Sequence, residues 1–192
     1  MIKKLLGSIR EYKKDSILAP IYVTLEVVLE VLIPYLMSMI IDKGIGEGDM
    51  PFIIRIGLIL IVSTLFSLGF GVLSGLHAAK ASAGFAKNIR KDMYYNIQDF
   101  SFSNIDQFST SSLITRLTTD ITNVQNSFQM IIRIMVRAPL MLVFSLLMAL
   151  NINSELRMVF LGAIPFLGLG LYLIMSKAFP IFQKVFRTYD KL

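Results

Sequence analysis

The sequence predicts an all-α fold: a polytopic membrane helix bundle of four transmembrane helices with long cytoplasmic helical extensions. Three observations carry this prediction. The chain of 192 residues is 55% hydrophobic and only 17% charged, whereas a soluble domain carries about 25% charged residues. The apolar residues gather in runs, and about 20 of them in a helix span a bilayer core. Most Lys and Arg residues fall on one side of these runs. The composition therefore argues against a disordered chain and against a soluble globular enzyme.

The first predicted span covers residues 17–41 and is interrupted only by Glu26 and Glu30. It is too long for the apolar region of a signal peptide, and no small-residue cleavage site follows it. Residues 42–51 hold three Gly and one Pro, which predicts a tight loop. The second span covers residues 52–76, and its length again suits a bilayer crossing.

The third span covers residues 126–150 and the fourth covers residues 156–176. Both are apolar helices of membrane-crossing length. The polar residues 151–155 form the short turn between them.

The basic residues set the orientation of the spans. Sixteen of the 19 Lys and Arg residues lie in the leader, in segment 77–137 or in the tail, and only Lys43, Arg55 and Arg157 flank the two short loops. Cytoplasmic segments carry the excess of basic residues. We therefore expect a multi-pass cell-membrane protein with its N-terminus and chain end in the cytoplasm. The net charge of +6 reflects this topology, so no nucleic-acid partner is expected.

The second span is predicted to continue as one helix to about residue 100. No Pro occurs between Phe52 and Phe100, and an apolar stripe keeps helical spacing beyond the bilayer. A turn at 101–112 then leads into a returning helix. The alternative is an amphipathic hairpin lying on the inner leaflet, against which the modest basic face and the admixed acidic residues argue.

Small residues recur at four-residue intervals along the second span and its extension. A ridge of this kind lets another helix backbone approach closely. Packing within the chain is the preferred interpretation, and a subunit interface is the alternative. The predicted packing residues are Ser63, Ser67, Gly71, Gly75 and Ala79, with Ala83 continuing the series.

The stretch FSNIDQFSTSSLITRLTTDITNVQ at 102–125 resembles the first intracellular loop of ABC exporters. Asp106, Leu113, Arg116 and Asp120 match the pattern of that loop, whereas Ser111 stands where the family often has Gly. The stretches IIDKGI at 40–45 and VRAPLM at 136–141 agree with the same family. The chain thus resembles the N-terminal part of an ABC exporter transmembrane domain, with the type I exporter fold. Within the family it is most similar to heterodimeric multidrug half-transporters.

The resemblance implies the permease part of an ATP-driven exporter that extrudes lipophilic or amphipathic drugs by alternating access. Implied partners are the bilayer, nucleotide-binding domains, small lipophilic substrates and a second half-transporter, with a heterodimer favoured. ATP and Mg would bind in a nucleotide-binding domain, because this chain has no G-x-x-x-x-G-K-[ST] stretch and no catalytic site of its own.

A helical stripe that runs on to Leu192 predicts that the chain is a piece of a longer protein. The alternative for this stripe is a frayed C-terminal helix, and the alternative to an exporter is a self-contained four-helix channel or scaffold. A peptide or lipid exporter would share the fold and differ only in substrate.

The resemblance also makes the tip segment a coupling element that docks on the ATPase domain. Exposed aromatic and aliphatic side chains at such a tip need a partner, and the alternative is that they pack back on the hairpin. The predicted coupling residues are Phe102, Asn104, Ile105, Asp106, Gln107 and Phe108.

Glu26 and Glu30 lie four residues apart and therefore on one helical face. Carboxylates at this depth are costly in lipid, so both should face protein or a wet cavity. They could attract cationic substrates; the alternative is a hydrogen-bonded brace. Other candidates for the cavity wall are the aromatic residues Phe66, Phe70 and Phe144, which more ordinarily pack or face lipid. With one His and no Cys, no metal site is expected.

Overall fold

The computed structural model describes residues 7–100, 110–152, 162, 165–176 and 178. The chain divides into two compact units, Met1–Phe144 and Ser145–Leu192, and each is described by itself. The described residues form helices and turns and contain no strand. The all-α class predicted from the sequence is therefore confirmed.

Among the described residues, three helical stretches are long and apolar enough to cross a membrane: Arg10–Ile45, Met50–Gln98 and Thr110–Ala149. A shorter apolar helix covers Pro165–Ser176. The predicted fourth span, 156–176, lies partly outside the described residues. Four as the number of spans therefore stays a prediction.

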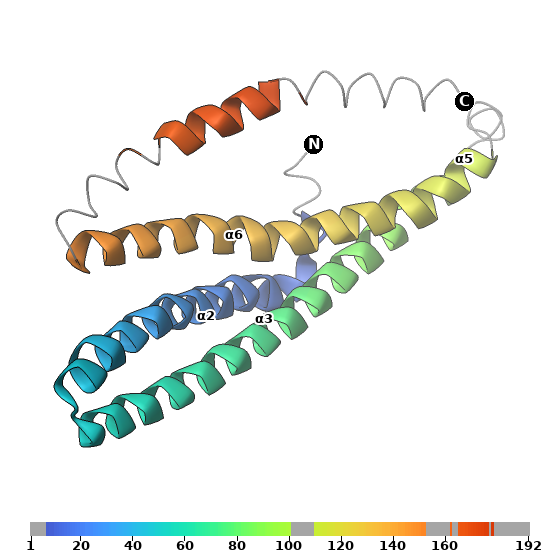
Figure 1. Cartoon of the computed structure of the whole chain (residues 1–192). Coiled ribbons are helices and arrows are strands. Elements are labelled where there is room, and N and C mark those ends of the chain that lie inside the picture. Colours follow the sequence, from blue (N-terminus) through green and yellow to red (C-terminus); the bar gives the residue numbers. More distant parts are fainter. Residues whose placement is uncertain (1–6, 101–109, 153–161, 163–164, 177, 179–192) are drawn as a thin grey trace. The chain divides into compact units, whose positions relative to one another are not determined.

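Helices α2 (Lys13–Met39) and α3 (Met50–Gln98) lie side by side as a hairpin (Figure 1). A short 3-10 turn, η1 (Arg10–Tyr12), precedes α2, and a π-helical segment, η2 (Ile40–Ile45), follows it.

The loop predicted at 42–51 is shorter in the structure. The helical conformation continues to Glu47, and the chain reverses at Gly48 and Asp49. Gly48 has a φ of 71°, which suits the residue that ends a helix. The Asp49 side chain accepts a hydrogen bond from the backbone N–H of Phe52 at 3.1 Å and so caps α3.

Helix α3 is one continuous helix of 49 residues, about 74 Å long at 1.5 Å per residue. This helix covers the predicted second span and continues to Gln98, whereas the membrane boundary at residue 76 stays a prediction. After residues 101–109, which lie outside the described residues, α5 (Thr110–Thr115), the π-helical segment η3 (Arg116–Asp120) and α6 (Ile121–Ile152) follow one another. Pro139 lies inside α6.

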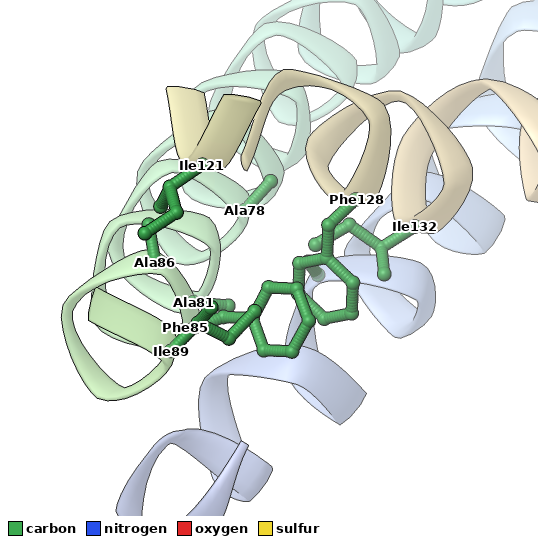
Figure 2. Close-up of a cluster of buried hydrophobic side chains, with 9 residues drawn as sticks. Ala78, Ala81, Phe85, Ala86, Ile89, Ile121, Phe128 and Ile132 are labelled. Carbon is green, nitrogen blue, oxygen red and sulfur yellow. The ribbon is translucent and has the colours of Figure 1, made fainter. Parts of the chain in front are cut away.

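The apolar core lies where α2, α3 and α6 meet (Figure 2). The rings of Phe85 from α3 and Phe128 from α6 pack with their centroids 4.5 Å apart. Ala19 of α2 and Ala78 of α3 are fully buried beside them, and their small side chains leave room for the rings. The core on α3 spans residues 78–89, beyond the predicted second span. Removal of these apolar side chains from water can therefore stabilise the core in this part of α3.

The predicted second span looks different from this core. Its large apolar side chains are exposed in the isolated chain, for example Leu58 at 59%, Leu65 at 62% and Leu68 at 66%. A continuous apolar surface of this kind needs lipid or further helices to cover it.

The first described residues lie along the far part of α3. Arg10 forms an ion pair with Asp92 at 2.9 Å. The Asn88 side-chain amide donates to the backbone carbonyl of Ser8, also at 2.9 Å, and Asn88 is buried. These contacts fix the first described residues to α3 about three to four turns beyond the predicted span.

Candidate functional site

The two acidic residues of the first span share one partner on α6. Arg137 Nη1 donates to Glu26 Oε1 at 2.9 Å, and Arg137 Nη2 donates to Glu30 Oε1 at 2.5 Å. Glu26 is only 8% exposed. Charged side chains in a membrane span pair with each other in this way because lipid cannot solvate them. The arrangement ties α2 to α6 through two charge-assisted hydrogen bonds.

Gly71 of α3 makes space for this ion cluster from the other side. A Cβ placed on Gly71 would lie 3.0 Å from Glu26 Oε1, which is too close for a comfortable contact. Ser67 and Ser63, one and two turns away on the same helix, are buried. Small side chains on α3 therefore let α2 approach at the level of its carboxylates.

Further along α3, the predicted ridge of small residues no longer lies on the helix face that contacts α2. Gly75 is half-buried and Ala79 is exposed, whereas Ala78 is fully buried. A strict four-residue repeat advances by about 40° at each step relative to the 3.6-residue turn. Ala79 consequently points away from the α2 interface, and a packing role for it toward other helices stays a prediction.

A cavity of about 600 Å³ lies beside the ion cluster, between α2 and α6. Its polar lining comes from Asn126, Gln129, Arg133 and Arg137, which recur every three or four residues along one face of α6. Apolar lining comes from Val23 of α2 and from Met130 and Ile134 of α6. The Arg133 Nη1 atom reaches across toward Gly75, where a Cβ would lie 4.0 Å from it.

The three predicted aromatic candidates are not among the residues that line this cavity. The Phe66 ring is 59% exposed and lies 6.3 Å from that of Phe70, which in turn stacks with Tyr22 at 6.2 Å. Phe144 is half-buried. Their role in a cavity formed with other helices stays a prediction.

The predicted coupling residues Phe102, Asn104, Ile105, Asp106, Gln107 and Phe108 lie outside the described residues. The structure places the end of α3 at Gln98 and the start of α5 at Thr110, so these predicted residues lie between the two helices in the sequence.

His77 belongs to a second polar cluster near the end of the predicted second span. Its Nδ1 lies 2.7 Å from Asp15 Oδ1, and its ring stacks on Tyr22 with centroids 5.4 Å apart. Lys80 Nζ lies 3.7 Å from the other oxygen of Asp15. Within the described part of the chain, no group of three or more His, Cys, Asp or Glu residues could hold a metal.

Sequence reasoning missed Arg137 as the partner of both carboxylates and missed Arg133 as a cavity residue. The signal was present in their spacing. Two arginines four residues apart precede Pro139 in an apolar helix, matching the spacing of the two glutamates in the first span. Intramembrane charges of opposite sign at equal spacing are candidates for pairing.

Residues 16–192 match the family described as the ABC transporter transmembrane region. The chain belongs to this family, and it is a multi-pass membrane protein. The long helices and the charged residues paired inside them fit that class.

Among similar proteins, the uncharacterized ABC transporter ATP-binding protein YfiB of Bacillus subtilis is 36% identical over 191 residues, covering 100% of this chain and 33% of YfiB. An uncharacterized ABC transporter ATP-binding protein of Mycobacterium tuberculosis is 27% identical, covering 95% and 31% of the two chains. The ATP-dependent lipid A-core flippase of Pseudoalteromonas translucida is 24% identical, covering 92% and 30%. The chain spans about a third of the length of these relatives.

Proposed function

We propose that this chain is the permease part of an ATP-driven exporter of lipophilic or amphipathic compounds. The observation that carries the proposal is the continuous helix α3, whose length is more than twice a hydrocarbon core of about 30 Å. Such a helix reaches well beyond the bilayer and brings its end close to the segment that resembles a coupling element. Family membership gives this arrangement its functional context.

The energy source lies outside this chain in the proposal. The relatives are named ATP-binding proteins and are about three times as long as this chain. We place ATP and Mg in a nucleotide-binding domain that segment 101–112 contacts. Outward transport then proceeds by alternating access. The N-terminus and the end of the chain lie on the cytoplasmic side. A second half-transporter completes the exporter, and a heterodimer is favoured.

The amphipathic substrate class has two supports. One relative is named for flipping lipid A-core. The cavity beside the ion cluster combines polar and apolar lining, as amphipathic ligands require. Pairing with Arg137 favours the brace interpretation for Glu26 and Glu30 over attraction of cationic substrates, because both carboxylates already have a cation as partner.

The coupling role can be tested by replacing Phe102 and Phe108 together with Ala in the full-length transporter. In proteoliposomes with a fluorescent amphipathic dye, we expect basal ATP hydrolysis to persist while dye transport and dye-stimulated hydrolysis are lost. The aromatic anchors of the docking contact are removed, while the ATPase domain itself is unchanged.

The matched control replaces Leu68 and Leu76 with Ala. Both are strongly exposed residues of the second span, far along α3 from the tip. Their double variant should transport normally. Normal transport by the Phe102 and Phe108 variant would remove the coupling assignment, and absence of ATP-dependent transport by the unmodified protein would remove the exporter proposal itself.

A further inference from the structure

The two arginines that line the cavity differ in their partners. Arg137 gives one guanidinium nitrogen to each of two carboxylates, so two negative charges already surround it. Arg133, one turn earlier on α6, forms no ion pair among the described residues, and its side chain is half-buried. A half-buried guanidinium in a membrane helix requires an anion or abundant polar contacts. Arg133 is therefore the group in this cavity with unused capacity to bind an anion.

Two amides stand next to Arg133 on the same face of α6. Gln129 and Asn126 precede it by four and seven residues, so the three side chains follow one line along the helix. The oxygen of Gln129 accepts from Ser82 Oγ at 3.5 Å, which leaves its amide nitrogen as the donor that it can offer a ligand. A guanidinium flanked by amide donors matches the acceptor oxygens of a phosphate or carboxylate.

The rest of the cavity suits an apolar body attached to that anion. Val23, Met130 and Ile134 supply aliphatic and thioether surface, and Met in particular adapts to ligands of differing shape. The volume of about 600 Å³ lies within the range of about 300–1,000 Å³ typical of small-molecule sites. A small inorganic anion would leave most of this volume and its apolar lining unused.

The depth of the site fits the same ligand. Val23 lies six residues after the start of the predicted first span, about 9 Å along the helix. In the predicted orientation, this lies within the cytoplasmic half of a hydrocarbon core of about 30 Å. An amphiphile could therefore keep its charged head at Arg133 while its apolar part reaches toward the bilayer interior.

We propose that Arg133, with Gln129 and Asn126, forms a headgroup subsite for an anionic amphiphile carrying a phosphate or carboxylate. The inference rests on the proposed exporter function and narrows its substrate class from amphipathic compounds in general to anionic ones. It reverses the sign of charge expected from the two glutamates, because Arg137 holds both carboxylates, whereas Arg133 has no carboxylate partner among the described residues.

The first test measures binding to the full-length transporter in nanodiscs of zwitterionic lipid. The probes are dodecyl phosphate, dodecyltrimethylammonium and inorganic phosphate. Of the three probes, we expect only dodecyl phosphate to bind. Arg133→Gln should weaken the affinity for dodecyl phosphate about tenfold or more, and Arg133→Lys should retain part of that affinity. The control is Arg55→Gln, an exposed arginine of α3 outside the cavity, which should bind as the unmodified protein does.

Three results would overturn the proposal. The first is equal binding by Arg133→Gln and the unmodified protein, which would mean that other helices satisfy Arg133. The second is binding of dodecyltrimethylammonium as tight as that of dodecyl phosphate, with the same loss in Arg133→Gln, which would show that the cavity does not select a negative charge. The third is equally tight binding of inorganic phosphate, which would make the site a simple anion site without an apolar compartment.

A second measurement does not depend on the folding of an Arg133 variant. The chain contains no Cys, so Met130→Cys places a single thiol in the cavity once any cysteines elsewhere in the full-length protein are replaced. Dodecyl phosphate should slow its labelling by a methanethiosulfonate reagent, whereas dodecyltrimethylammonium and inorganic phosphate should not. The control Met135→Cys, on the same helix and outside the cavity lining, should be labelled equally with and without the probe.

Failure of the proposal is distinguishable from failure of the exporter function. ATP-dependent transport of neutral or cationic amphiphiles without protection of Met130→Cys by dodecyl phosphate would refute the anionic subsite alone. Protection of Met130→Cys without ATP-dependent transport of any amphiphile would leave the subsite in place and refute the exporter.

Discussion

Replacing Arg137 with Met leaves the carboxylates of Glu26 and Glu30 without their shared cation. Removing one partner of a buried ion pair costs about 3–5 kcal/mol, because an uncompensated charge remains in a poorly solvating environment. The side chain of Arg137 is 39% exposed and that of Glu30 is 27% exposed, so solvent screens part of the interaction. We therefore expect a loss of about 2 kcal/mol, less than a fully buried pair would give.

The assay is thermal stability of the full-length transporter in detergent, read as the fraction that remains monodisperse after heating. For a unit of 150–250 residues, 2 kcal/mol corresponds to a fall in Tm of about 4–8 °C. The control Arg55→Met removes an exposed arginine of α3 and should shift Tm little.

A compensating variant separates charge from shape. Combining Arg137→Met with Glu26→Gln and Glu30→Gln removes all three charges and should recover much of the lost stability, since no unpaired charge remains. Two results would refute the reasoning that the cluster is an electrostatic brace. The first is an Arg137→Met variant with the same Tm as the unmodified protein. The second is a triple variant whose Tm is as low as that of the single variant.

Two further predictions concern the packing of α3 beyond the predicted second span. Gly84→Ala should destabilise the protein by about 1–3 kcal/mol, because its Cβ would overlap the ring of Tyr12. The control Gly69→Ala, whose Cβ would meet nothing within 4 Å, should leave the stability unchanged. Equal melting temperatures of the two variants would contradict this packing. Phe85→Ala removes a 3% exposed ring from its contact with Phe128 and should cost about 3–5 kcal/mol, measured by thermal unfolding; a change below about 1 kcal/mol would show that this core contributes little.

Much of the fold was predictable because membrane insertion imposes a strong pattern on the sequence. Long apolar runs can only be helices when lipid surrounds them, and the absence of Pro along α3 after its first turn predicts its continuity. The reversal at Gly48 and Asp49 was harder to place. The Asp and Gly residues within Ile40–Ile45 do not reverse the chain, which continues there as the π-helical segment η2.

The candidate site was predictable only in part. The cost of a carboxylate in a span predicts that Glu26 and Glu30 face something polar, and both contact Arg137. The identity of that partner depends on the relative register of α2 and α6, which lie 111 residues apart in sequence at the Glu26 contact. Periodicity within one helix contains no information about this register. The same holds for Arg133, whose importance follows from what Arg137 already binds.

The length of α3 allows a small change in its tilt to produce a larger displacement at its far end. With the predicted second span ending at residue 76, the part of α3 that continues to Gln98 is about 33 Å long. Within α3, no proline after Pro51 interrupts the helix. The contacts of Arg10 and Asn88 hold the first described residues against this part of α3. A tilt of about 10° at the membrane surface would displace the far end by about 6 Å, roughly the length of one helical turn. In the proposed exporter, a small rearrangement of the spans around a ligand would move the far end of α3 by a distance of this size, and displacement of a domain docked there would tilt the spans in return.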